Sequence, residues 1–135
     1  MIVLAGFVVV ASSLCLIGLA CVIFIRPAPA QRFLMSFASS AQAHYVEQAF
    51  RLLLGTSLVV LSPTMWQAPL FRLIGWAIVL ASIVLLLMPW QWHNQFAKRV
   101  LPQLVKYMRL YATGAFAFGS LLLYAVFFGG SRGAP

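Results

Sequence analysis

Long apolar segments separated by short polar connections dominate the pattern along this chain. A helix that crosses a bilayer needs about 20 predominantly apolar residues, and four segments approach or exceed that length. Prolines and charged residues close them, as in Arg26-Pro27-Ala28-Pro29. The pattern predicts an all-α integral membrane protein whose four transmembrane helices form an antiparallel bundle. We expect the spans at about residues 2–25, 44–62, 69–90 and 107–128.

The connections before the second and fourth spans are amphipathic. At helical spacing, Phe33, Leu34 and Phe37 fall near one face of the first connection, with serines on the other side. Trp92, Phe96 and Val100 form one stripe on the connection before the fourth span. Tryptophan and amphipathic helices favour the membrane–water boundary. We therefore expect interfacial helices at about residues 31–43 and 91–106.

Composition agrees with this class. The 135 residues are 64% hydrophobic and only 7% charged, a balance far from that of a soluble domain. The length leaves room for one transmembrane domain, residues 1–135. We expect the first segment to be retained as a span, because it lacks a basic start and is longer than the apolar core of a secretory signal. The glycine-rich tail at 129–135 is expected to be flexible.

Basic residues set the expected orientation. They cluster in the first and third connections, and the positive-inside rule places such connections in the cytoplasm. Both termini should then lie on the other side, and a bacterial inner membrane fits this arrangement. The positive charge is expected to face anionic lipid headgroups or a partner and not nucleic acid. The residues concerned are Arg26, Arg32, Lys98, Arg99, Lys106 and Arg109.

The one acidic side chain, Glu47, lies near the start of the second span. An ionised group close to hydrocarbon costs several kcal/mol unless it is paired or reaches the interface. His44 and Arg51 precede and follow Glu47 by one helical turn, so all three fall on one face. The hairpin of the second and third spans would bring His93 to the same membrane level. These residues form the candidate polar cluster.

Three interpretations of this cluster stay open. In the simplest, Glu47 and Arg51 neutralise each other and the histidines make ordinary hydrogen bonds. In the second, His44 and His93 ligate a haem or bind a quinone headgroup. In the third, Glu47 is a proton-coupled transport site. Size and span number resemble those of small multidrug transporters, but their carboxylate lies well inside the first helix, and Arg51 would hold Glu47 ionised.

Small residues at helical spacing predict where the helices pack. Pairs of small residues four apart let two helix backbones approach closely in a membrane. The two cysteines, Cys15 and Cys21, point to different sides of one helix and are expected to stay unpaired. The candidate packing residues are Gly55, Gly75, Ala77, Ala81, Ala115 and Gly119.

No catalytic or metal-binding pattern is present in the sequence. A single acid cannot supply an acid–base pair, and the chain has no nucleotide motif or metal-ligand spacing. No cofactor is required by any motif. The combination of lipid-compatible surfaces, packing residues and a basic face predicts a small accessory or assembly subunit of a larger membrane protein complex.

Overall fold

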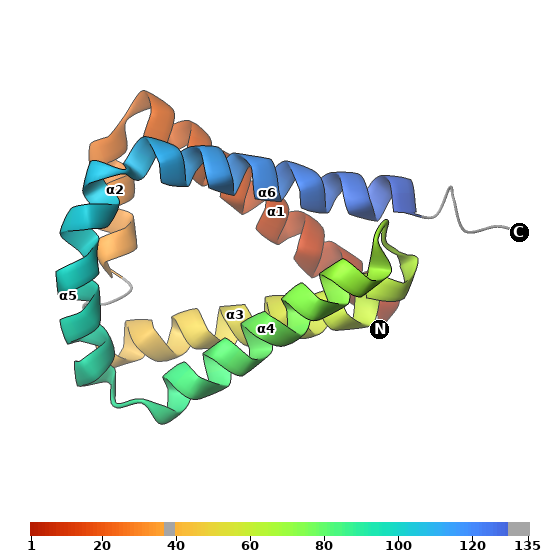
Figure 1. Cartoon of the computed structure of the whole chain (residues 1–135), viewed down its shortest axis with the longest axis horizontal. Coiled ribbons are helices and arrows are strands. Elements are labelled where there is room, and N and C mark those ends of the chain that lie inside the picture. Colours follow the sequence, from red (N-terminus) through yellow and green to blue (C-terminus); the bar gives the residue numbers. More distant parts are fainter. Residues whose placement is uncertain (37–39, 130–135) are drawn as a thin grey trace, which may run out of the picture.

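The computed structural model describes residues 1–36 and 40–129, apart from the side chain of residue 101. The described residues form helices joined by short connections, with no strand among them (Figure 1). The elements are α1 (Ile2–Ile25), α2 (Pro27–Ser36), α3 (Ala41–Leu61), the short 3-10 helix η1 (Ser62–Thr64), α4 (Ala68–Leu87), α5 (Trp90–Lys106) and α6 (Met108–Gly129). Residues 130–135 of the predicted tail 129–135, and Phe37 of the first amphipathic stripe, lie outside the described residues; Gly129 is the last residue of α6.

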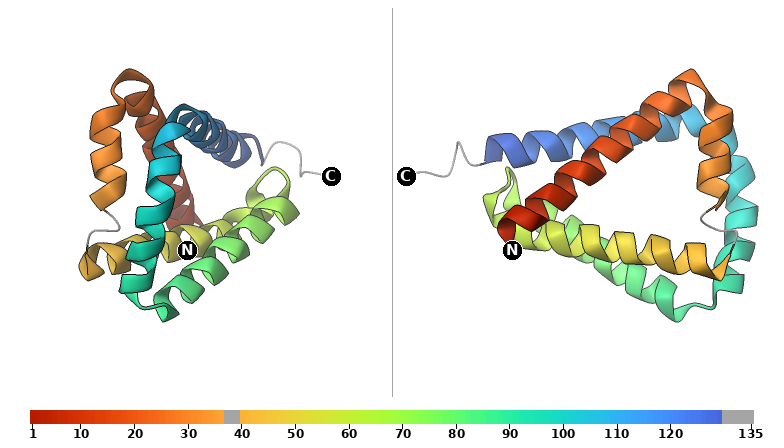
Figure 2. Two further views of the ribbon diagram at one scale, coloured as in Figure 1. Left: turned by 60° about the vertical axis from the view of Figure 1, so that its left-hand side comes forward. Right: turned by 180° about the vertical axis from the view of Figure 1, so that it is seen from behind.

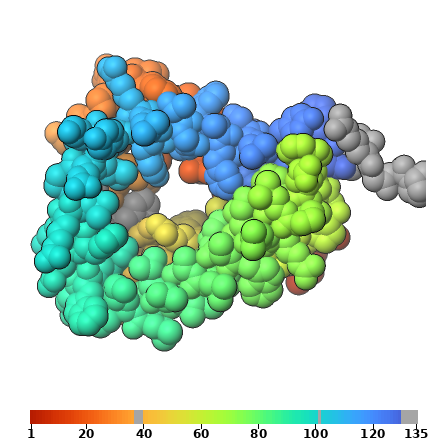
Figure 3. Space-filling view, in the orientation of Figure 1, coloured from red at the N-terminus to blue at the C-terminus, as the bar shows by residue number. Residues whose placement is uncertain are grey.

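The long helices are arranged as two packed pairs. Helix α1 packs along α6, and α3 packs along α4. The pairs meet at the end that carries the N-terminus and η1, and they diverge toward the end where α2 and α5 lie (Figure 2). The outline is therefore a triangle, and the space-filling view shows an opening between the two pairs (Figure 3). We call the two ends the convergent end and the wide end.

Three helices have the length and composition of membrane spans: α1, α4 and α6. The protein is thus a helical, multi-pass membrane protein. The expected second span corresponds to α3, which is 21 residues long but does not reach the hydropathy of the other three. The reason lies in its first half, where polar side chains interrupt the apolar sequence.

The helix boundaries differ from the sequence expectation at two connections. Prolines 27 and 29 end α1, yet Pro27 also begins α2, because proline suits the first position of a helix. The first connecting helix is therefore Pro27–Ser36 and not 31–43. Helix α3 already begins at Ala41, because the Ser40 side chain accepts a hydrogen bond from the Ala43 amide at 3.2 Å. Its serine cap starts the helix one turn earlier than hydropathy alone indicated.

The other elements lie close to their expected ranges. Helix α4 ends at Leu87, just before Pro89, and α5 occupies Trp90–Lys106. Trp92 and Phe96 on α5 are exposed, and no residue of α5 with a described side chain is buried. Helix α5 therefore presents an apolar stripe outward, as an interfacial helix does.

Glycines mark the closest approach between helices. Helix α3 crosses α4 at Gly55 and Gly75, where the two backbones lie nearly in contact. Helix α1 crosses α6 at Gly119, where an added β-carbon would lie 2.9 Å from the Ser13 carbonyl oxygen. Ala115, one turn from Gly119, is also buried. These four positions pack within the chain.

Ala77 and Ala81 do not take part in this packing. Both lie on the exposed side of α4. The face of α4 that packs inward carries Phe71, Gly75 and Val79, together with Ser82. Spacing alone identified a small-residue pair on α4, but the hairpin with α3 selects the face that contains Gly75.

The convergent end holds the larger core. Val9, Leu58, Phe71 and Leu122 come from four different helices and are almost fully buried together. The loop between η1 and α4 is fastened to α6, because the Trp66 amide donates a hydrogen bond to the Ala125 carbonyl oxygen at 3.1 Å. A second cluster joins α1, α2 and α6 toward the wide end. The wide end of the α3–α4 pair contributes to neither core; there α3 meets α5 at the polar cluster.

Candidate functional site

The candidate site begins with a carbonyl group that the helix cannot satisfy. Leu85 lies four residues before Pro89, and proline has no amide hydrogen to donate. His44 from α3 supplies the missing donor: its Nε2 donates to the Leu85 carbonyl oxygen at 3.2 Å. The His44 side chain therefore caps the C-terminal end of α4, where carbonyl groups are left without helical partners.

That hydrogen bond fixes the chemistry of the His44 ring. A carbonyl oxygen only accepts, so Nε2 carries the hydrogen of this bond. His44 is 1% exposed, and within the described part of the chain its Nδ1 has no hydrogen-bond partner. A buried ring nitrogen is thus without a partner at the junction of α3 and α4.

Glu47 lies between two cationic or protonatable groups. Arg51 donates a hydrogen bond from Nη2 to Glu47 Oε1 at 2.5 Å, along one face of α3. His93 of α5 approaches from the other side, with Nε2 3.8 Å from Glu47 Oε2. The polar cluster of His44, Glu47, Arg51 and His93 is therefore assembled from α3 and α5. The cluster therefore links two helices that are separated in the sequence by all of α4.

The two histidines lie side by side. Their ring centroids are 4.7 Å apart and the rings are tilted by 47°. Burial lowers the pKa of His93 below its ordinary value of 6.5, and this outweighs the opposing attraction of Glu47; His44 and Arg51 add to the lowering. His93 is thus mainly neutral near pH 7. Only its small protonated fraction can form an ion pair with Glu47.

Gln48 is a member of the site that the sequence analysis missed. It is 0% exposed, and neither its Oε1 nor its Nε2 has a partner among the described residues. It lies one turn after His44 on the same buried face of α3. The sequence did contain a signal. Gln48 lies four residues after His44 in an apolar helix, and a buried amide there needs hydrogen-bond partners just as a charged group does.

The basic residues gather at the wide end. Arg26, Arg32, Lys98, Arg99, Lys106 and Arg109 are all exposed, on α2, α5 and the adjoining helix ends. Figure 1 places both α2 and α5 at this end. Lys98 and Arg99 follow His93 on α5, so the basic face begins next to the polar cluster.

The histidine pair does not fit haem ligation from both sides. A metal–imidazole bond is about 2 Å long, so two axial imidazoles would place their ring centres roughly 6 Å apart across the iron. The observed 4.7 Å is too short for this arrangement. A groove of about 750 Å³ does exist nearby, but its lining comes from α1, α2 and the opposite side of α3 and contains no histidine.

Comparison of the chain with known protein families, curated proteins and solved structures finds no match.

Proposed function

We propose that this protein is a small accessory subunit that assembles into a larger membrane protein complex. The supporting observation is the groove between α1 and α3, which has a volume of about 750 Å³. Its walls are almost wholly apolar, as the surface of a membrane helix is. The groove would accept a transmembrane helix of the partner. The lining residues are Phe7, Val8, Ala11, Ser12, Cys15, Leu16, Gly18, Leu19, Phe33, Phe50, Leu53 and Leu54.

The composition of one wall favours a helix as the occupant. Helix α1 contributes Ala11, Ser12, Cys15 and Gly18, which are small residues on adjacent turns. Small residues allow close backbone approach between membrane helices. A β-carbon added at Gly18 would meet nothing within 4 Å, so this part of α1 is not already used by packing within the chain.

The proposal includes a fourth span. A helix the length of α3, 21 residues, reaches about 30 Å at 1.5 Å per residue, which matches the hydrocarbon thickness. Its charged residues and its histidine lie in its first half, toward the wide end, where Arg51 can extend toward the headgroups. We therefore place α1, α3, α4 and α6 across the bilayer as an antiparallel bundle.

The basic wide end gives the proposed orientation. By the positive-inside rule, α2 and α5 lie on the cytoplasmic surface of a bacterial inner membrane and contact anionic headgroups. Both termini then lie on the other side. The partner would meet the protein within the membrane, through the groove, and at the cytoplasmic surface, through the basic face.

A second candidate function is binding of a quinone headgroup. The specific support is the set of three buried, unpartnered polar atoms on His44 and Gln48. A quinone carbonyl could accept a hydrogen bond from the Gln48 amide. The proton-coupled transport alternative has less support, because the Glu47 carboxylate is already paired with the Arg51 guanidinium. Organic extraction of purified protein tests the quinone proposal, which requires a quinone in wild type and its loss in Gln48→Leu.

Site-specific crosslinking tests the accessory-subunit proposal. A photoreactive amino acid is placed at position 15, inside the groove, or at position 21, which lies on α1 but does not line it. In native membranes we expect position 15 to form one adduct with a protein that also co-purifies in mild detergent. Position 21 should form little of it. An adduct of twice the 14.9 kDa chain mass, or equal adducts from both positions, would overturn the proposal.

A further inference from the structure

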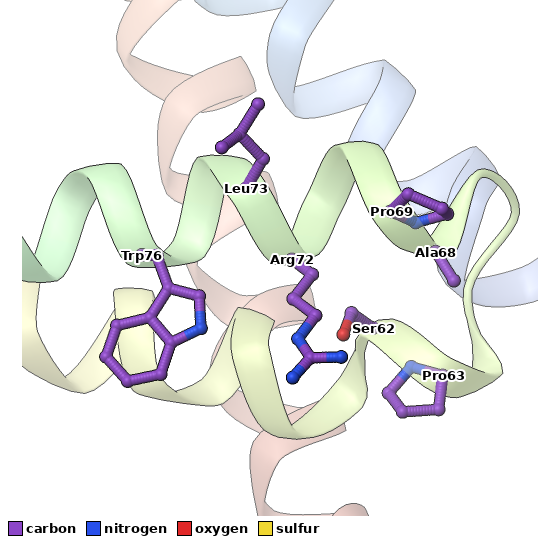
Figure 4. A pocket seen from close by; sticks show the side chains of 7 residues that line it. All are labelled: Ser62, Pro63, Ala68, Pro69, Arg72, Leu73 and Trp76. Atoms are coloured by element: carbon purple, nitrogen blue, oxygen red, sulfur yellow. The ribbon is translucent and has the colours of Figure 1, made fainter.

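A pocket at the convergent end contains a cationic side chain that has no carboxylate partner among the described residues. The pocket has a volume of about 490 Å³ and lies where the end of α3, η1 and the start of α4 meet (Figure 4). It is at the opposite end of the molecule from the basic face of α2 and α5. Its lining residues are Ser62, Pro63, Ala68, Pro69, Arg72, Leu73 and Trp76.

Arg72 is the charged group in this pocket. The chain has one acidic side chain, Glu47, and that carboxylate is bound to Arg51 at the wide end. Across residues 1–36 and 40–129, the Arg72 side chain has neither an ion pair nor a hydrogen bond. A permanent charge close to the hydrocarbon is costly without a counter-charge, so this site calls for an anion.

The pocket is built for a ligand that is charged at one end and apolar at the other. Arg72 and Trp76 project from α4 to the same side, with the guanidinium near Ser62 and Pro63 (Figure 4). Trp76 is one turn deeper along the helix and is half-exposed. Tryptophan prefers the depth at which headgroups meet acyl chains. The indole therefore marks that boundary, and Arg72 lies on its headgroup side.

The exposed side of α4 continues the apolar surface away from the pocket. Leu80, Val84 and Leu87 follow Trp76 at intervals of three or four residues and are all exposed. This spacing places them on one stripe of the helix. Acyl chains that start at the pocket could lie along the stripe toward the middle of the membrane.

We propose that this pocket binds the phosphate of an anionic membrane lipid in the leaflet opposite to the basic face. The Arg72 guanidinium forms a paired, charge-assisted hydrogen bond with the phosphate, which arginine geometry favours. Trp76 packs against the glycerol region, and the α4 stripe contacts the acyl chains. This site does not depend on the accessory-subunit proposal, because it needs only the isolated chain.

Tryptophan fluorescence can localise the lipid. The chain has 4 tryptophans, so replacing Trp66, Trp90 and Trp92 by phenylalanine leaves Trp76 as the only reporter. The purified variant is placed in phosphatidylcholine vesicles that contain a small fraction of either brominated phosphatidylglycerol or brominated phosphatidylcholine. Bromine quenches the indole only at close range. We expect the anionic lipid to quench Trp76 more strongly at equal mole fraction.

Variants at arginine separate this site from general attraction. Arg72→Gln should weaken the preference for the anionic lipid roughly tenfold, as expected for losing one charge-assisted contact. Arg72→Lys should keep much of it, which guards against a folding defect. Arg99→Gln, at the other end, should leave the preference unchanged. Equal quenching by both lipids, or an equal loss in Arg99→Gln, would overturn the proposal.

Two further arms distinguish the source of the anion. Excess inorganic phosphate should not remove the preference; if it does, the pocket takes a free anion and the lipid proposal is wrong. If the purified chain shows no preference while Arg72→Gln disrupts a complex in native membranes, Arg72 pairs with an acidic segment of a partner protein. That result would also overturn the lipid proposal.

Discussion

Gly55 of α3 and Gly75 of α4 lie against each other with no room for a methyl group between the helices. A β-carbon at Gly75 would come within 2.8 Å of the Gly55 carbonyl oxygen, and one at Gly55 within 3.0 Å of the Gly75 carbonyl oxygen. Both neighbours are backbone atoms, which cannot rotate away. This crossing sets the spacing of the α3–α4 pair, and therefore the reach of His44 to the Leu85 carbonyl.

Gly75→Ala is expected to destabilise the protein by about 1–3 kcal/mol, the usual cost of overpacking a tight contact. Thermal unfolding in detergent measures the effect. Gly114→Ala is the matched control, because a β-carbon at Gly114 meets nothing within 4 Å. Since alanine favours helix more than glycine, the control should be neutral or slightly stabilising. Equal losses in both variants would contradict the crossing.

Glu47→Gln is expected to reduce stability and assembly, because Arg51 and His93 lose their common partner. Arg51 is 46% exposed and Glu47 17%, so the coupling energy should be about 1 kcal/mol or less. A double-mutant cycle with Arg51→Gln measures it. The double variant should lose less than the sum of the single losses. Strict additivity would show that the pair carries no energy, and unchanged assembly with lost transport would favour the carrier alternative.

Stability is expected to fall as the pH drops below 6.5. Burial lowers the pKa of His93 in the folded protein, so the unfolded chain binds a proton more readily in that range. The contribution of His93 is fully present above pH 6.5 and is lost as pH falls toward the lowered pKa. Unfolding midpoints at pH 7.5 and 5.5 should differ less in His93→Gln. In Glu47→Gln the difference should increase, since the opposing attraction is removed.

Gln48→Met is expected to raise the stability of the isolated protein. The amide is fully buried and its polar atoms have no partner among the described residues. Replacing such a group by an apolar one of similar shape removes a penalty of about 1–3 kcal/mol. Gln42→Met, on an exposed position of α3, should change little. A lower stability for Gln48→Met would mean that a ligand or internal water satisfies the amide.

Thiol labelling is expected to place the two ends of the molecule in different compartments. In a variant without Cys15 and Cys21, a cysteine replaces either Arg99 on α5 or Gln67 in the loop before α4; both positions are exposed. A membrane-impermeant maleimide added to intact cells should label position 67 and not position 99. Labelling of both, or of position 99 alone, would reject the proposed orientation.

Much of the helical arrangement follows from hydropathy and from the prolines and charged residues that end the apolar segments. The apolar runs of α1, α4 and α6 and the amphipathic stripe on α5 are strong periodic signals, so their ranges were predicted closely. The starts of α2 and α3 were not, since Pro27 and Ser40 act locally as a helix start and a cap. Such effects change a boundary by one turn without altering hydropathy.

The polar cluster was partly predictable for a topological reason. Helical spacing alone places Glu47 beside Arg51, and the hairpin between α3 and α4 returns the chain to the level of His44, where His93 follows. The bond from His44 to the Leu85 carbonyl was not anticipated, because it depends on the amide that Pro89 lacks. The exposure of Ala77 and Ala81 was equally hidden, because two faces of α4 carry small residues and only packing distinguishes them.

The triangular outline has a mechanical consequence. In the proposed placement, α2 and α5 lie along one membrane surface and the long helices converge at the other, so the protein would take more lateral area from one leaflet than from its opposite. A flat bilayer must make up this difference with extra lipid around the narrow end. Curvature that relieves this mismatch would therefore favour the protein, so its distribution in a cell would depend on membrane shape.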